Sequence, residues 1–166
     1  MLRLSRIIPI AAAALVLGAL ACDRSGPTGP NTVNPPALDI VKSTDQFACN
    51  QVINPVTGEV SYQLQTLAGE NLRPELNQLG NLVCASFVAG NITPNEFNGL
   101  SAKLFAASAA LERGQIGTFV NIMNAFINQS QAIFVNRNCN GTEVSGVCHD
   151  LNQIINEAQR VLGGIT

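Results

Sequence analysis

Apolar residues recur at helical spacing through most of the chain beyond residue 70. In several stretches they return every three or four positions, which places them along one side of a helix. The pattern predicts four helices, over residues 71–89, 93–113, 115–135 and 150–162. Because the connections between these stretches are short, we expect a mainly α fold in which three to four helices form a small antiparallel bundle.

Two of these helices carry a start signal in the sequence. Thr93 and Glu96 have the spacing of a capping box, and Pro94 suits the first helical position. Asp150 and Gln153 repeat the capping-box spacing at the start of the last predicted helix. We therefore expect Thr93 and Asp150 to be the N-cap residues of their helices.

A different pattern precedes the helices. Two stretches that contain β-branched and aromatic residues flank the turn-rich segment 54–58 (NPVTG). This arrangement predicts a β-hairpin within residues 45–66. Because two strands alone are only marginally stable in water, we expect the hairpin to lie on the helices.

The first residues of the chain have the organisation of a signal peptide. Arg3 and Arg6 form a basic start, and the next 15 residues, 7–21, carry no charge. A membrane-spanning helix needs about 20 apolar residues. We therefore expect residues 1–21 to be cleaved after export and not to be kept as a transmembrane anchor.

Residues 18–22 (GALAC) resemble the lipobox of bacterial lipoproteins. In that family, small residues precede a cysteine that receives acyl chains such as palmitate and becomes the new N-terminus. Ala19 stands where the family usually has Leu. The resemblance implies that Cys22 anchors the protein in a membrane of the cell envelope, on its periplasmic or outer side. The alternative is ordinary cleavage after Ala21, which would release a soluble secreted protein.

The segment after the proposed anchor is rich in Gly and Pro and lacks any apolar periodicity. Together with Cys22 it predicts a lipidated, flexible tether over residues 22–44. A single domain over residues 45–166 follows.

The chain contains five cysteines. With Cys22 set aside, an even set of four remains in the domain, and in an exported protein such a set predicts two disulfides. Three pairings are open. Cys139 and Cys148 flank one loop, so a local bridge between them is the natural pairing. A bridge from Cys49 to Cys84 would fasten the hairpin to the first helix.

Composition and charge exclude several functions. The chain has 9 Lys and Arg against 11 Asp and Glu, and removal of Arg3 and Arg6 leaves seven cations and a net charge of −4. No basic patch is present for nucleic acid. A single His and widely spaced cysteines do not make a zinc site, and there is no Gly-rich phosphate loop. We expect no nucleic-acid partner, no metal and no cofactor.

Candidate catalytic residues are few. His149 and Asp150 adjoin, but neighbours in a helix do not generally face each other, and an N-cap role explains Asp150 better. The glutamates are dispersed, so a carboxylate pair at glycosidase spacing would arise only by tertiary coincidence. We therefore expect that the protein is not an enzyme.

Two further sets of side chains have both a structural and a functional interpretation. The polar stripe of Asn121, Asn124 and Asn128 indicates a solvent-facing helix surface, with partner or sugar binding as the alternative. The second set is expected in the core, with the lining of an apolar cavity as the alternative. It consists of Phe97, Phe105, Phe119, Phe126 and Phe134.

The helical part of the chain resembles small modules of secreted and cell-surface bacterial proteins, of the FIMAH and FIVAR sort. The matching segments are residues 89–93 (AGNIT), 100–104 (LSAKL), 110–114 (ALERG), 124–129 (NAFINQ) and 155–158 (INEA). The resemblance implies a helical bundle that accompanies exported enzymes or adhesins as an accessory or interaction domain.

These observations lead to two functional hypotheses. The first is a non-catalytic, envelope-anchored lipoprotein that acts as an interaction or structural module, with an unknown protein partner and the membrane bound through Cys22. The alternative is a periplasmic or surface carrier of a lipid or another apolar ligand, with the phenylalanines lining its cavity.

Overall fold

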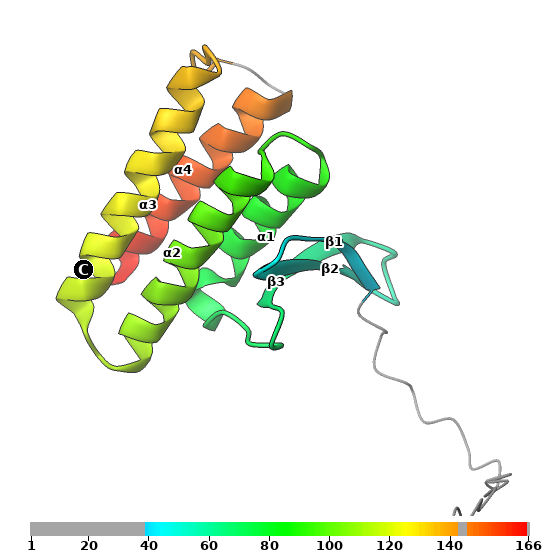
Figure 1. Cartoon of the computed structure of the whole chain (residues 1–166), viewed down its shortest axis with the longest axis horizontal. Coiled ribbons are helices and arrows are strands. Elements are labelled where there is room, and N and C mark those ends of the chain that lie inside the picture. The colour runs from blue at the N-terminus through cyan, green and yellow to red at the C-terminus, as the bar shows by residue number, and fades with distance from the viewer. Residues whose placement is uncertain (1–38, 143–145, 166) are drawn as a thin grey trace, which may run out of the picture. The chain divides into compact units, whose positions relative to one another are not determined.

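The computed structural model describes residues 39–142 and 146–165. Four helices, α1 (Pro74–Val88), α2 (Pro94–Glu112), α3 (Ile116–Asn136) and α4 (Gly146–Ile165), run alternately up and down as a bundle (Figure 1). α2 packs between α1 and α3, and α4 packs against α3 and α1. The predicted mainly α bundle is confirmed, with four helices. The predicted signal peptide and Cys22 lie outside the described residues.

A three-stranded antiparallel sheet lies against α1, at one side of the bundle (Figure 1). Its strands are β1 (Asp39–Ser43), β2 (Phe47–Ile53) and β3 (Val60–Thr66), with β2 in the centre. β2 and β3 pair from Phe47 opposite Thr66 to Ile53 opposite Val60, so the predicted hairpin is confirmed. The Asn54 side chain accepts hydrogen bonds from the backbone N–H groups of Val56 and Thr57 and so shapes the turn.

β1 corrects the predicted extent of the tether. Residues 39–43 belong to the predicted tether over 22–44, but they form a strand that pairs with β2. Lys42 explains part of this docking, because its ammonium group donates a hydrogen bond to the carbonyl oxygen of Phe87 and lies 4.1 Å from the centre of the Phe87 ring. Phe87 is 45 residues away in the sequence, so no local pattern could reveal this contact. Residues 22–38 of the predicted tether lie outside the described residues.

The core lies between the four helices and continues to the inner face of the sheet. Phe97, Phe119 and Phe126 are fully buried, whereas Phe105 and Phe134 are half-buried and pack against the core, so the predicted core positions are confirmed. Phe97 also stacks on Phe87, with ring centres 4.1 Å apart. Contacts between aromatic rings add to the free energy gained by their burial.

The N-terminus of α2 follows its sequence signal. The Thr93 hydroxyl accepts a hydrogen bond from the Glu96 N–H, and the Glu96 carboxylate accepts one from the Thr93 N–H, with Pro94 at the first helical position. The predicted capping box is therefore confirmed.

The start of α4 corrects the sequence prediction. The helix begins at Gly146 and not at Asp150, which lies inside it. Val147 precedes Leu151 by one turn and packs against the core, so burial of this extra turn favours an earlier start than the Asp150 and Gln153 pattern indicates. Asp150 therefore is not the N-cap residue.

Candidate functional site

The four cysteines of the domain form two disulfides. Cys49 is bonded to Cys84 and Cys139 to Cys148. Both predicted pairings are therefore present, and Cys22 belongs to neither bond.

The two disulfides lie in different surroundings. Cys49 and Cys84 are fully buried, and their bond joins the central strand of the sheet to α1. Cys139 and Cys148 are half-buried, and their bond joins the residues after α3 to the first turn of α4. Disulfides persist in oxidising compartments, so the pairs indicate an environment outside the reducing cytosol. In the part of the chain that the structure describes, no helix is both long and apolar enough to cross a membrane.

His149 and Asp150 each contact a further residue in this fold. The Asp150 carboxylate accepts a hydrogen bond of 2.7 Å from the Asn91 amide, in the connection between α1 and α2. The His149 ring lies 3.1 Å from the Gln153 amide nitrogen, one turn along α4. The first contact ties α4 to the α1–α2 connection, and the second lies within α4.

Several polar side chains meet at one end of the bundle, where the α1–α2 connection approaches the end of α3 and the start of α4 (Figure 1). The Arg137 guanidinium donates hydrogen bonds to the Asn91 carbonyl oxygen at 3.1 Å and to the Glu96 carboxylate at 2.9 Å. We call this cluster of Asn91, Glu96, Arg137 and Asp150, with the disulfide between Cys139 and Cys148, the loop end. It links the α1–α2 connection to α2, to the end of α3 and to α4 through polar contacts.

The Glu96 carboxyl has a pKa below its ordinary value. Burial acts in the opposite direction and is the largest single effect, but it is outweighed by the hydrogen bonds from Thr93 and by the charge of Arg137. The structure therefore favours the ionised carboxylate, which serves both the capping box and the ion pair.

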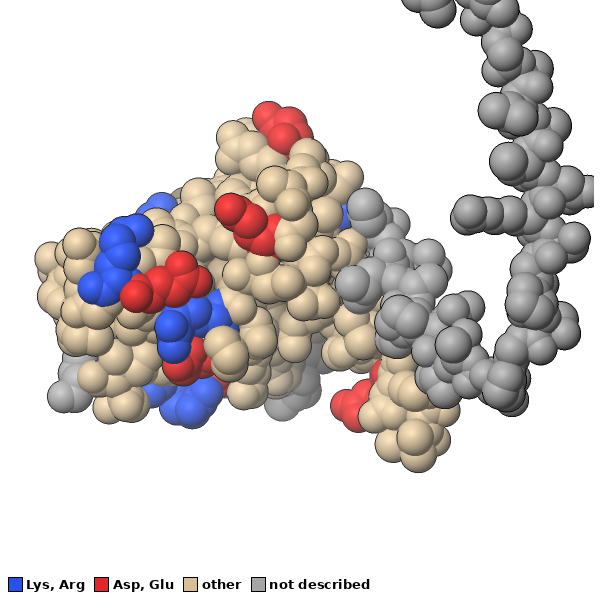
Figure 2. All heavy atoms as spheres, turned by 90° about the horizontal axis from the view of Figure 1, so that it is seen from below, with Lys and Arg blue, Asp and Glu red and all other residues tan. Residues whose placement is uncertain are grey.

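The polar stripe on α3 faces solvent. Asn121, Asn124 and Asn128 are all exposed, as the amphipathic pattern predicts. Charges elsewhere on the surface form local pairs, such as Arg73 with Glu75 and Arg160 with Glu157. On the face shown in Figure 2, basic and acidic side chains lie next to each other. Among residues 39–142 and 146–165, no group of three or more His, Cys, Asp and Glu side chains is placed to hold a metal ion.

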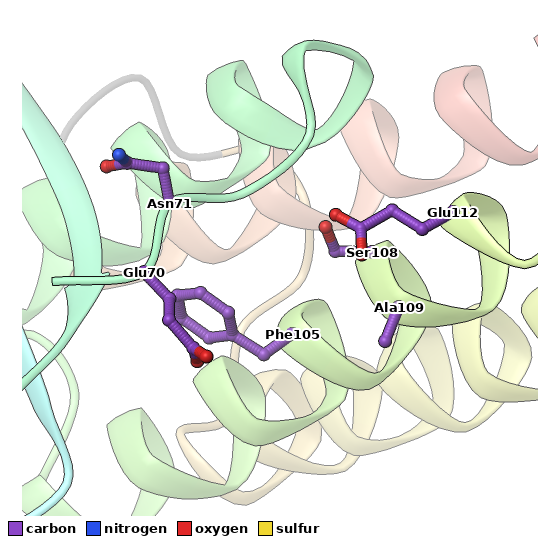
Figure 3. A pocket seen from close by; sticks show the side chains of 6 residues that line it. All are labelled: Glu70, Asn71, Phe105, Ser108, Ala109 and Glu112. Atoms are coloured by element: carbon purple, nitrogen blue, oxygen red, sulfur yellow. The ribbon is translucent and has the colours of Figure 1, made fainter. Parts of the chain in front are cut away.

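A surface pocket between α2 and the segment before α1 is the candidate functional site that the sequence did not reveal. It has a volume of about 220 Å³ and is lined by Glu70, Asn71, Phe105, Ser108, Ala109 and Glu112. The last four residues project from one face of α2 toward residues 70 and 71 (Figure 3). Their spacing of three, four and seven positions is visible in the sequence, but the opposite wall comes from a segment more than 30 residues earlier. We call this the Glu70–Glu112 pocket.

The chain matches no protein-family model, no curated protein and no solved structure. The resemblance to FIMAH and FIVAR modules therefore stays a prediction that rests on the sequence segments alone.

Proposed function

We propose that this chain is an exported lipoprotein and serves as a non-catalytic interaction or structural module of the cell envelope. The observation that carries the proposal is the cysteine arrangement. All four cysteines of the domain are used in disulfides, which leaves Cys22, at the end of a lipobox-like sequence, as the remaining thiol. Acylation would explain why an exported chain has an odd number of cysteines.

The interaction role is supported by what the candidate catalytic residues do in the fold. Asp150 is held by Asn91, and His149 lies next to Gln153, so each has a structural contact. Two disulfides and a filled core provide a small, rigid scaffold on which a surface can be presented.

The alternative of an apolar-ligand carrier gains no support from Phe97, Phe119 or Phe126. Phe97 lies with its ring on Phe87, and Phe119 and Phe126 are fully buried in the core. This is the packing of a filled interior.

Intact-mass measurement of the mature protein tests the anchor. We expect a chain that begins at Cys22, carries the added mass of acyl chains and lacks the four hydrogens that two disulfides remove. A Cys22→Ser variant is expected to lose the acyl mass and to leave the membrane fraction. A mature chain with an unmodified Cys22 would overturn the anchor.

Cross-linking in intact cells followed by affinity purification tests the interaction role. We expect a defined envelope protein to be captured by the wild-type chain and also by a His149→Ala variant. A reproducible hydrolase activity of the purified protein that His149→Ala abolishes would contradict the non-catalytic proposal.

A further inference from the structure

The Glu70–Glu112 pocket combines negative charge with an aromatic surface. Glu70 contributes one carboxylate from the segment before α1, and Glu112 contributes a second from the last residue of α2. Among the described residues that line the pocket there is neither Lys nor Arg. The nearby Arg73 guanidinium is bonded to Glu75, at 3.0 and 3.2 Å. A ligand in this pocket therefore meets two carboxylates, and the charge of Arg73 balances that of Glu112 in part.

The ring of Phe105 forms the apolar wall. On one side it stacks on Phe47, with ring centres 5.5 Å apart and an angle of 11° between the planes. The ring is only half-buried, and it also lines the pocket. An aromatic ring attracts a cation placed over its face through its quadrupole, and neighbouring carboxylates strengthen that attraction.

Ser108 supplies a polar atom deep in the pocket. The residue is only 3% exposed, and its hydroxyl oxygen accepts a hydrogen bond of 3.0 Å from the Arg73 backbone N–H. A hydroxyl oxygen has two acceptor positions. The Arg73 N–H occupies one of them and so ties Ser108 to the segment before α1.

The walls of the pocket are held in place before any ligand arrives. The Glu70 N–H donates to the Thr66 hydroxyl at 3.0 Å, and the Thr66 N–H donates to the Glu70 carbonyl oxygen at 3.1 Å. The bond between Arg73 and Ser108 ties the same segment to α2. A site whose walls are already ordered loses less conformational entropy when it binds.

We propose that the Glu70–Glu112 pocket binds an alkylammonium group. Its volume lies below the range of about 300–1,000 Å³ found for drug-sized ligands, which suits a small head group. The carboxylates repel anions, and the ring surface favours an organic cation over a hydrated metal ion, which prefers a shell of oxygen ligands. The group can belong to a free small molecule or to the lysine side chain of a partner protein. This proposal does not depend on acylation of Cys22.

Titration of the mature, disulfide-bonded protein, followed by NMR, tests the proposal. The probes are choline, its uncharged isostere 3,3-dimethylbutan-1-ol, and Nα-acetyl-lysine N-methylamide. We expect at least one of the two cations to shift the signals of Phe105 and Ala109 saturably, and the uncharged isostere to have no such effect. Stronger binding of choline would indicate a small-molecule ligand, whereas stronger binding of the lysine derivative would indicate a partner side chain.

Matched variants locate the binding. Glu70→Gln combined with Glu112→Gln keeps the shape of two exposed side chains and is expected to weaken cation binding about tenfold, because both negative charges are lost. Glu59→Gln, in the loop between β2 and β3, removes a carboxylate elsewhere and should leave binding unchanged. The proposal is overturned if neither cation binds saturably, if the uncharged isostere binds equally well, or if the double variant binds like the wild type.

Discussion

The sheet and the loop end are both fastened to the helices by a disulfide, but different forces surround the two bonds. Around Cys49 and Cys84 the contacts are apolar, with Leu64, Leu72 and Gly80 all buried where the sheet meets α1. We call this region the sheet junction. At the loop end the disulfide is half-buried, and its neighbours are hydrogen bonds and an ion pair.

The difference shows how a small domain holds elements that cannot stand alone. A three-stranded sheet with strands of only five to seven residues needs an apolar partner surface, and α1 provides it. At the loop end, polar contacts and a local cross-link act together with the packing of Val147 against the core. Loss of a contact at the sheet junction should therefore cost more stability than loss of one at the loop end.

Removal of each disulfide gives the largest test. In the chain-entropy model, a bridge across 35 residues stabilises the fold by about 4 kcal/mol and one across 9 residues by about 3 kcal/mol. Truncation of the buried pair adds a packing cost. We expect Cys49→Ala with Cys84→Ala to lower the free energy of unfolding more than Cys139→Ala with Cys148→Ala, as measured by urea denaturation. Equal losses would show that the surroundings of the two bonds do not matter.

Two helical glycines give a test of intermediate size. A Cβ at Gly80 would lie 2.6 Å from Leu72 Cδ1 and 3.3 Å from Leu64 Cβ, inside the sheet junction. We expect Gly80→Ala to destabilise by about 1–2 kcal/mol, because overpacking outweighs the gain in helix propensity.

Gly99→Ala is the matched control on α2. Its Cβ would lie 2.5 Å from Nε2 of Gln129, the mobile end of a side chain. Movement of that amide sacrifices its hydrogen bond with Lys103, and the helix gains about 1 kcal/mol of propensity. We expect almost no net change in thermal stability. A larger loss for Gly99→Ala than for Gly80→Ala would contradict the comparison.

A double-mutant cycle tests the contact between Asn91 and Asp150. A hydrogen bond to a carboxylate contributes about 1.5–3 kcal/mol, so the effects of Asn91→Ala and Asp150→Ala on unfolding should be coupled by about 1 kcal/mol or more. If Asp150 were an N-cap residue, as its sequence context suggested, its removal would act independently of Asn91.

The smallest expected effect is the pH dependence at the loop end. The pKa of Glu96 in the fold lies below its ordinary value of 4.5, so its contribution is complete above that pH and is lost as the pH falls through the lower, folded value. Glu96→Gln should flatten the decline of stability below pH 4.5 by up to about 1 kcal/mol. Thermal denaturation at pH 7 and pH 3 measures this, with Glu59→Gln as the control. If the stability of the wild type and of Glu96→Gln fell equally between pH 7 and pH 3, Glu96 would not contribute to the pH dependence.

Local signals account for the part of the fold that was predicted. The apolar spacing located all four helices, and Thr93 with Glu96 marked the start of α2, because a capping box involves residues only three positions apart. The turn at residues 54–58 predicted the hairpin, because a turn also depends on residues that are close in sequence. Where the prediction failed, at β1 and at the start of α4, the deciding contacts come from Phe87 and from the core.

The candidate pocket illustrates the same limit. Phe105, Ser108, Ala109 and Glu112 share a helix face that the sequence displays, yet nothing local relates them to Glu70. Only the packing of the segment before α1 against α2 turns that face into one wall of a cavity.

The sequence by itself determined the helices, the hairpin and a set of four cysteines that could pair within the domain. Periodicity and capping depend on residues a few positions apart, and the number of cysteines can be counted without knowing the fold. The tertiary structure decided which cysteines pair, that residues 39–43 join the sheet, that α4 starts a turn early, and that two distant carboxylates share a pocket. Each of these depends on burial or contact between segments that only the folded chain brings together.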